Sequence, residues 1–171
     1  TNEIPTWSSD GEYIIFSKLI FTTGYLFIAK PDGTILKKIQ TGNLSSSKTM
    51  SIDGRFVYYS KMTHFCRMDL STGTEENYGS SLSYYADYVS ISPDGRYVLC
   101  SYNGDIFIYE IITQSTTNLA SGSDPCWTPD GKTIIYTNGS NIYRINIDLT
   151  NNKQLTFTND CSSPCVKWKP K

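Results

Sequence analysis

The sequence predicts an all-β protein made of four repeats of a four-stranded antiparallel sheet. Three observations support this: a turn motif that recurs four times, an apolar pattern that follows each copy at a regular distance, and a composition suited to strands. Of the 171 residues, 39% are hydrophobic, only 18% are charged and 13 are Tyr. This composition favours strands joined by polar turns over helices or disorder.

The recurring motif is an apolar residue, Ser or Thr, any residue, Asp-Gly, and then an apolar run. Its four copies are WSSDGEYIIFS from Trp7, MSIDGRFVYYS from Met50, ISPDGRYVLCS from Ile91 and WTPDGKTIIYT from Trp127. The Asp residues stand at positions 10, 53, 94 and 130, so consecutive copies are 43, 41 and 36 residues apart. Such distances are near the roughly 40 to 45 residues of a four-stranded β-propeller blade.

Each repeat is predicted to contain four strands, A to D in chain order. Strand A ends at the first residue of the motif, and Asp-Gly then reverses the chain because Gly accepts a positive φ and Asp can bond its own backbone. Strand B is the apolar run that ends in Ser or Thr. Strand C is an alternating stretch around Phe27, Cys66, Phe107 or Tyr143. Strand D is polar and surrounds Ile39, Tyr78, Leu119 or Leu155, as expected for an outer edge that avoids pairing with other sheets.

The predicted blades cover residues 4–42, 48–81, 88–121 and 125–157 of a single domain, 1–171. The segment 164–169 repeats the strand A pattern and is predicted to be an extra innermost strand. The chain therefore begins and ends at the same phase of the repeat. Three explanations fit this phase: a displaced terminal strand, membership of a larger ring, or assembly of copies to complete a ring. The second is favoured because rings of 4–8 blades are usual.

The motifs resemble the TolB-type propeller repeat, a relative of the tryptophan-aspartate repeats. The hallmark of that family is Trp-Ser-Pro-Asp-Gly-Lys followed by an apolar strand. The copy from Trp127 nearly matches it and the copy from Ile91 is close, whereas the copy from Met50 lacks both the Trp and the Pro. The resemblance covers essentially the whole chain and implies a β-propeller, but it implies function only loosely because propellers host unrelated activities. It favours a periplasmic or extracellular location, while the odd number of Cys leaves a cytoplasmic one open.

Charge and hydropathy argue against two classes of partner. The net charge is −1, and the 15 Lys and Arg are scattered along the chain. Without a basic block to follow a phosphate backbone, nucleic-acid binding is disfavoured. The longest apolar run is far shorter than the roughly 20 residues that span a bilayer, so membrane insertion is not expected.

The residues that could serve catalysis are better explained by structural roles. A Gly-x-Ser-x-Gly elbow is absent, and the only histidine, His64, is expected at the start of a strand C, away from any nucleophile. The four motif Asp residues, Asp10, Asp53, Asp94 and Asp130, occupy equivalent turns and are interpreted as structural, not as the paired carboxylates of a glycosidase. We therefore predict no enzyme activity, no catalytic residue and no cofactor.

The five cysteines cannot all pair within the chain. Cys66 and Cys100 lie in apolar strand patterns and are predicted to be buried. Cys126, Cys161 and Cys165 remain for one bridge, and the spacing of the last two allows it in an oxidising compartment. A zinc site needs four ligands, so this pair does not predict a metal.

The remaining candidate is the surface formed by the B-to-C and D-to-A connections, which emerge at the same end of each blade. Tyr is favoured at interfaces because it joins a rigid apolar ring to a hydrogen-bonding tip. The predicted contact residues are Tyr84, Tyr85, Tyr88, Tyr102, His64 and Phe21. Packing between blades is the alternative for the tyrosines. The B-to-C connections are predicted to include residues 101–104 in the third repeat and the longer segment 18–24 in the first. Within the latter, the segment 19–21 is either a loop folded back on the blade or an exposed apolar anchor.

Two functions fit these expectations. The first is a non-enzymatic module that binds a protein or peptide, within a larger propeller. The second is the substrate-gating propeller of a prolyl-oligopeptidase-like hydrolase, whose chemistry would come from another part of a longer chain. Self-association that completes a ring is a third, weaker hypothesis.

Overall fold

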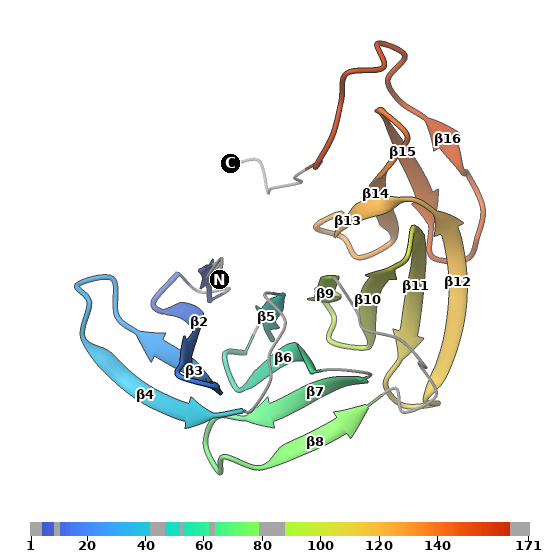
Figure 1. Ribbon diagram of the computed structural model, residues 1–171. Coiled ribbons are helices and arrows are strands. Elements are labelled where there is room, and N and C mark those ends of the chain that lie inside the picture. Colours follow the sequence, from blue (N-terminus) through green and yellow to red (C-terminus); the bar gives the residue numbers. More distant parts are fainter. Residues whose placement is uncertain are drawn as a thin grey trace. The chain divides into compact units, whose positions relative to one another are not determined.

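The computed structural model describes residues 5–8, 11–41, 47–51, 53–61, 64–78 and 88–164, and of His64 only the backbone. Within these residues every regular element is a strand, and the strands form four antiparallel sheets of four (Figure 1). The predicted all-β chain of four four-stranded repeats is thus confirmed. The predicted extra strand at 164–169 lies, except for its first residue, outside the described residues.

The chain divides into two compact units, residues 1–89 and 90–171. In the first, blade 1 comprises β1 (Thr6–Trp7), β2 (Ile14–Ile20), β3 (Thr23–Ala29) and β4 (Ile35–Gln40). Blade 2 comprises β5 (Lys48–Met50), β6 (Phe56–Lys61), β7 (His64–Asp69) and β8 (Glu75–Tyr78). The division between units falls inside β9. Blade 3 comprises β9 (Tyr88–Ile91), β10 (Tyr97–Tyr102), β11 (Asp105–Glu110) and β12 (Ser115–Ser121), and blade 4 comprises β13 (Ser123–Trp127), β14 (Thr133–Asn138), β15 (Asn141–Asn146) and β16 (Lys153–Gln154).

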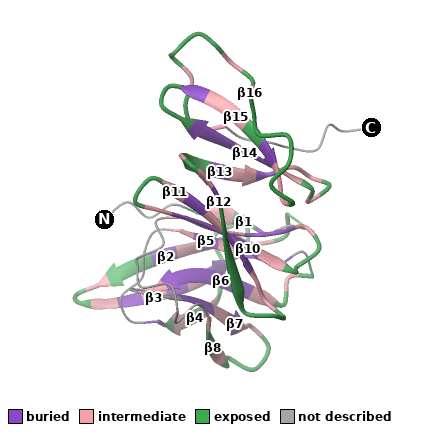
Figure 2. Cartoon of the chain, turned by 90° about the vertical axis from the view of Figure 1, so that its right-hand side faces the viewer, coloured by how far each residue is buried: buried purple, intermediate pink, exposed green. Residues whose placement is uncertain are grey.

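In every sheet the strands lie side by side in chain order, so they take the positions A to D predicted for them. Buried residues gather on the B and C strands, whereas the outer strand β12 is exposed at most of its positions (Figure 2). Strands β6 and β10 each contain four consecutive buried residues, which shows that both faces of these B strands are covered. The polar D strand is therefore the solvent-facing edge that the sequence predicted.

The A-to-B turns are held by the same bonds in each copy. The hydroxyl of the motif Ser or Thr accepts a hydrogen bond from the backbone N–H five residues later, at 2.8–3.1 Å. The four accepting residues are Ser8, Ser51, Ser92 and Thr128. The motif glycine donates its N–H to the carbonyl of that same residue at 2.9–3.0 Å. It does so with φ between 67° and 75°, a region that favours glycine. The Asp-Gly pair is thus required by the turn geometry.

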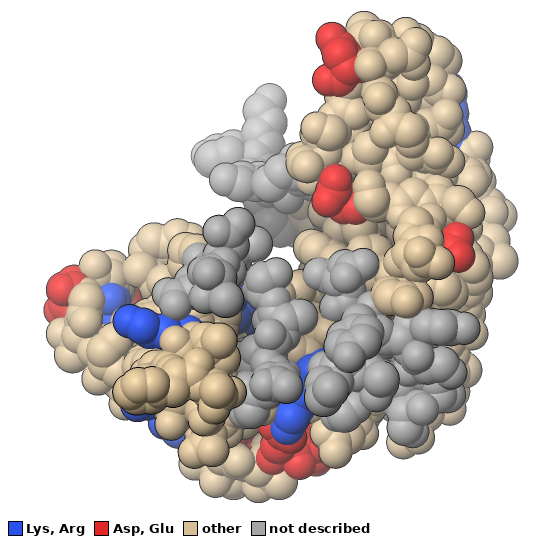
Figure 3. Space-filling model, viewed as in Figure 1, with Lys and Arg blue, Asp and Glu red and all other residues tan. Residues whose placement is uncertain are grey.

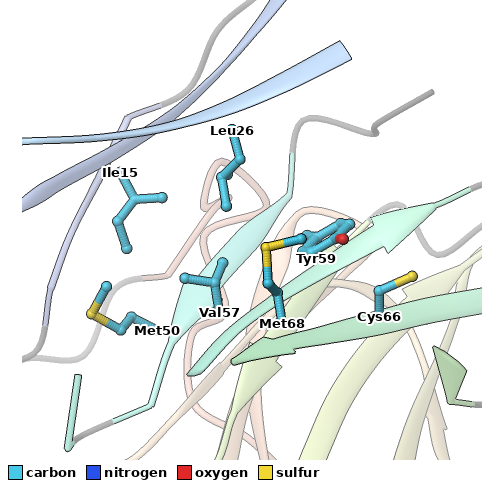
Figure 4. Packing of buried hydrophobic residues seen from close by; sticks show 7 residues of the cluster. All are labelled: Ile15, Leu26, Met50, Val57, Tyr59, Cys66 and Met68. Atoms are coloured by element: carbon cyan, nitrogen blue, oxygen red, sulfur yellow. The ribbon is translucent and has the colours of Figure 1, made fainter. Parts of the chain in front are cut away.

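Blades 1 and 2 pack through an apolar layer in the first unit. Ile15 and Leu26 of blade 1 contact a cluster of blade 2 side chains that are all at least 96% buried: Met50, Val57, Tyr59, Cys66 and Met68. Figure 4 shows these side chains pointing into one shared layer. Blade 1 therefore uses one sheet face to cover a face of blade 2, so that apolar side chains on both sheets are removed from water.

One sequence expectation is wrong in detail. The segment 18–24 was predicted to be a long B-to-C connection, but Leu19 and Ile20 belong to β2 and pair with Gly24 and Thr23 of β3. The added residues lengthen both strands because side-chain alternation and backbone pairing continue through them. Only Phe21 and Thr22 form the turn. In blade 3, Ser101 and Tyr102 likewise belong to β10, not to the connection.

Candidate functional site

In blades 1, 3 and 4, two-residue hairpin turns join the B and C strands at residues 21–22, 103–104 and 139–140. In blade 2, β6 ends at Lys61 and β7 begins at His64, and these two residues pair. Three predicted contact residues lie at or beside these turns in successive blades: Phe21 in blade 1, His64 at the start of β7 in blade 2, and Tyr102 at the end of β10 in blade 3. These residues thus each lie where the B strand leads to the C strand of their own blade, although the side chain of His64 lies outside the described part.

Phe21 is the most exposed of the described candidates. Its side chain is 95% exposed, and its backbone has a φ of 56°. In blade 4 the same first turn position is taken by Gly139, whose φ is 59°. Glycine is the usual residue there, because a side chain at positive φ approaches its own backbone. Of the two alternatives for segment 19–21, the structure therefore supports an exposed residue at the hairpin tip and not a loop folded back on the blade.

The tyrosine candidates differ in how far the structure describes them. Tyr102 is half-buried and pairs with Asp105 across the hairpin, where the Ser121 hydroxyl donates to the Asp105 carboxylate at 2.9 Å. Tyr88 is half-buried at the start of β9. Tyr84 and Tyr85 lie outside the described residues, so their role stays a prediction.

The motif carboxylates serve the turns. In blades 2 to 4, Oδ1 of Asp53, Asp94 and Asp130 accepts one bond from the Ser or Thr hydroxyl two residues before it and one from the backbone N–H two residues after it. The hydroxyl of Ser51 lowers the pKa of Asp53, and that of Thr128 lowers the pKa of Asp130. The three carboxylates therefore bond within their own turns, which agrees with the structural role that the sequence predicted. Asp10 lies outside the described residues.

A polar cluster in blade 2 was not predicted from the sequence. The Tyr59 hydroxyl donates to the carboxylate of Glu75, and Nζ of Lys61 donates to the other oxygen of that carboxylate at 2.8 Å. Burial raises the pKa of Tyr59 and raises that of the nearby Cys66 thiol to about 12. Both groups thus keep their protons at neutral pH, which suits a structural network and not a nucleophile. The three strands meet only in the folded sheet, so no sequence spacing could reveal the cluster.

The cysteine predictions are confirmed where the structure tests them. Cys66 and Cys100 are buried, and burial raises the pKa of the Cys100 thiol to about 12. Cys161 is partly exposed, with its sulfur 3.3 Å from the Thr158 hydroxyl. Cys165 lies outside the described residues, so the bridge stays a prediction.

Blades 2 and 3 carry open hollows at matching positions on their sheets. The first, of about 260 Å³, is lined by Arg55, Phe56, Arg67, Asp69, Thr72, Thr74 and Glu76. Its charges are paired internally, since Arg55 bonds Asp69 at 2.9 Å and Arg67 bonds Glu76 at 2.5 Å. The second, of about 200 Å³, is lined by Tyr97, Ile108, Glu110, Ser115, Thr117 and Ile147. Neither offers a free charge for a ligand among these lining residues.

Charged side chains form small separate patches on the face seen in Figure 3. In the described residues, no group of three or more His, Cys, Asp and Glu is placed to hold a metal ion. That same portion of the chain contains no helix of the length and hydropathy that a membrane crossing requires.

Comparison with known proteins places these features in a fold. The family model of the dipeptidyl peptidase IV (DPP IV) N-terminal region matches residues 92–165. No curated protein matches the sequence.

Solved structures resemble the chain much more extensively. A putative TolB from Agrobacterium tumefaciens is 21% identical, with a TM-score of 0.73 over 91% of this chain and 62% of its own. TolB from Acinetobacter baumannii is 18% identical, with a TM-score of 0.70 over 92% and 44%. The Cps50 (Swd1) β-propeller domain of Myceliophteria thermophila is 12% identical, with a TM-score of 0.72 over 94% and 59%. This chain thus spans about half of the length of the structures it resembles, and its repeats are TolB-like β-propeller blades.

Proposed function

We propose that this chain is a non-enzymatic propeller module that binds a protein or peptide at the ends of its B-to-C hairpins, with Phe21 as the apolar anchor. Tyr84, Tyr85, Tyr88, Tyr102 and His64 are proposed as further contact residues. The observation that carries this proposal is the conformation of Phe21, an exposed aromatic residue held at positive φ.

Folding alone gives little reason for Phe at this position. A side chain that is 95% exposed contributes almost no buried apolar area. A non-glycine residue in the left-handed region costs about 1 to 2 kcal/mol. Blade 4 forms the corresponding turn with Gly139. Local strain of this kind, combined with an exposed aromatic ring, is typical of residues that serve recognition.

Replacing Phe21 by Gly tests the proposal because it separates binding from folding. Peptides would first be selected from a random displayed library on the wild-type protein, and their affinities measured by calorimetry. We expect F21G to weaken binding at least about tenfold, the loss of a modest anchor. Its thermal midpoint should not fall, since glycine removes the strain. Phe157→Ala, at another Phe that is 75% exposed, is the matched control and should bind as the wild type does. Selected peptides that bind F21G with unchanged affinity would exclude this site.

A specific observation favours a second function. The match of residues 92–165 to the N-terminal region of dipeptidyl peptidase IV suggests a propeller that accompanies a peptidase. In that case the module would control access of a peptide to a catalytic domain. Sequencing the parent gene on both sides of this segment distinguishes the two. An adjacent Gly-x-Ser-x-Gly hydrolase domain would support gating, whereas further Asp-Gly repeats alone would support the binding module.

A further inference from the structure

The B-to-C hairpin of blade 3 turns through an Asn-Gly dipeptide. Asn103 and Gly104 join β10 to β11, and Tyr102 pairs with Asp105 across them. The two turn residues are exposed and have φ values of 50° and 82°. Positive φ at both central positions is typical of a type I′ turn, which strongly prefers Asn-Gly. The hairpin therefore has the turn type that its sequence favours.

The peptide group between Asn103 and Gly104 is not held by other groups. Among the residues that the structure describes, neither this peptide group nor the Asn103 side-chain amide forms a hydrogen bond. The Gly104 carbonyl, which accepts from the Gly122 N–H at 2.7 Å, belongs to the next peptide group. A carbon added at Gly104 would find no atom within 4 Å. The peptide group can therefore rotate without breaking a bond among these residues.

An Asn side chain followed by Gly can react with the backbone, because Gly has no side chain to hinder attack by its nitrogen. The attack closes a five-membered ring that places this nitrogen beside Cβ of the Asn. For an L residue the ring requires a ψ of about −120°, which is the ψ of the first central residue in a type II′ turn. Types I′ and II′ share the positive φ at that residue and differ by a flip of the central peptide group. Both suit hairpins, so the flip leaves the paired strands in place.

Blade 4 contains a second Asn-Gly dipeptide, at a different position in its hairpin. Asn138 is the last residue of β14 and pairs with Asn141, and Gly139 is the first residue of the turn. Both members of this dipeptide are exposed, as they are in blade 3. A residue in an antiparallel strand has a ψ of about +135°. Asn138 can therefore reach the ring geometry only by giving up its strand pairing.

We propose that Asn103 is a site of spontaneous deamidation, in which the turn flips from type I′ to type II′ and the Gly104 nitrogen attacks Cγ of Asn103. The N–Cγ bond forms, the bond from Cγ to the amide nitrogen breaks, and ammonia leaves with the proton that Gly104 loses. Water then opens the cyclic imide. Cleavage of the new N–Cγ bond gives aspartate, whereas cleavage of the original peptide bond gives isoaspartate, in which the main chain passes through Cγ.

Either product adds a negative charge at the hairpin end of blade 3. Asp105, whose carboxylate accepts from the Ser121 hydroxyl at 2.9 Å, lies two positions away, so the new carboxylate would repel a charge already present. Isoaspartate also lengthens the main chain within a two-residue turn. The surface beside Tyr102 would therefore change in charge and shape as the protein ages, without an enzyme. The reaction itself does not depend on peptide binding at the hairpins.

Peptide mapping by mass spectrometry measures the conversion at each site. The folded chain would be incubated in mildly alkaline buffer, which promotes loss of the Gly104 N–H proton. We expect Asn103 to convert at least about tenfold faster than Asn138, because the reaction at Asn138 requires loss of strand pairing. In guanidinium chloride, where both hairpins are unfolded, the two rates should agree within about twofold. Asn138 is thus an internal control with the same dipeptide.

Ammonia released by the folded chain provides a second measurement. Asn103→Gln should lower the release at least about threefold, since Gln would have to form a larger ring more slowly. Asn138→Gln is the matched control and should leave the release unchanged. F21G should deamidate as the wild type does, so a failure of the peptide-binding proposal would not affect this test.

Three results would overturn the proposal. The first is an unchanged Asn103 in the folded chain after a time in which the denatured chain has converted. The second is conversion of Asn138 as fast as that of Asn103 in the folded chain. The third is an equal preference for Asn103 in guanidinium chloride, which would assign the preference to neighbouring residues and not to the hairpin.

Discussion

Replacing Ser92 by Ala removes two hydrogen bonds from the A-to-B turn of blade 3. The Ser92 hydroxyl donates to Asp94 Oδ1 at 2.6 Å and accepts from the backbone N–H of Tyr97 at 2.9 Å. Ser92 is only 3% exposed, so water cannot readily replace the lost acceptor. The backbone bonds of the turn, from Ser92 N to Tyr97 O and from Gly95 N to Ser92 O, remain.

The expected loss follows from these contacts. A hydrogen bond contributes about 0.5 to 1.5 kcal/mol net, and a buried donor left without an acceptor costs about 1 to 3 kcal/mol. Asp94 keeps its bond from Arg96 N–H at 3.1 Å, so its carboxylate remains partly satisfied. We therefore expect S92A to lower the free energy of unfolding by about 2 to 3 kcal/mol, most of it from the Tyr97 N–H.

Urea denaturation followed by far-ultraviolet circular dichroism measures this loss. Ser123→Ala, at an exposed serine of blade 4, is the control and should change stability by less than about 0.5 kcal/mol. In a double-mutant cycle, the effects of Ser92→Ala and Asp94→Ala should not add, because the two residues share one bond. A loss below about 0.5 kcal/mol for S92A, or full additivity, would refute the role assigned to this hydroxyl.

Two further predictions concern backbone conformation and buried thiols. Gly95→Ala should cost about 1 kcal/mol, because its φ is 73° although no atom lies within 4 Å of the added carbon. Gly131→Ala should cost more, since the added carbon would also lie 3.3 Å from Pro93 Cδ; equal losses in urea denaturation would contradict this. Burial raises the pKa of Cys66 and Cys100 to about 12, above the value of about 8.5 for an unfolded thiol. The contribution of these protonated thiols to the free energy of unfolding is therefore complete below about pH 8.5 and is lost as the pH rises towards 12. Between about pH 7 and pH 10, the free energy of unfolding should thus fall less for Cys100→Ala than for the wild type. Identical pH dependence in urea denaturation would argue against this burial effect.

Much of the fold could be predicted because its determinants are local in the sequence. Each Ser/Thr-x-Asp-Gly motif contains the hydroxyl, the carboxylate and the glycine that its turn requires, so the strand order followed from motif positions alone. The lengthened hairpin of blade 1 was harder. Its extra residues, Leu19 and Ile20, alternate like any strand, and no Gly or Asn marks the true turn at Phe21. Because Phe is not favoured at positive φ, its presence at position 21 gives no sequence signal for a turn.

The candidate surfaces were only partly predictable, for a different reason. Phe21 was expected as one contact among several, but its near-complete exposure depends on the paired strands beneath it. The difference in exposure between Trp7, at 56%, and Trp127, at 8%, could not be foreseen, because both begin nearly the same motif. Whether a motif tryptophan is covered depends on the neighbouring blade, and that information lies outside the repeat itself.

The bonds that define each A-to-B turn join residues no more than five positions apart, and every sheet joins only strands that are consecutive in the chain. A blade can therefore form without closing a long loop, and the contacts between blades can follow. During synthesis, each blade could assemble once its own residues have emerged. A duplication that adds one whole repeat would preserve every strand pairing already present. The local turn thus explains how a chain of this kind can lengthen in evolution while each blade keeps its structure.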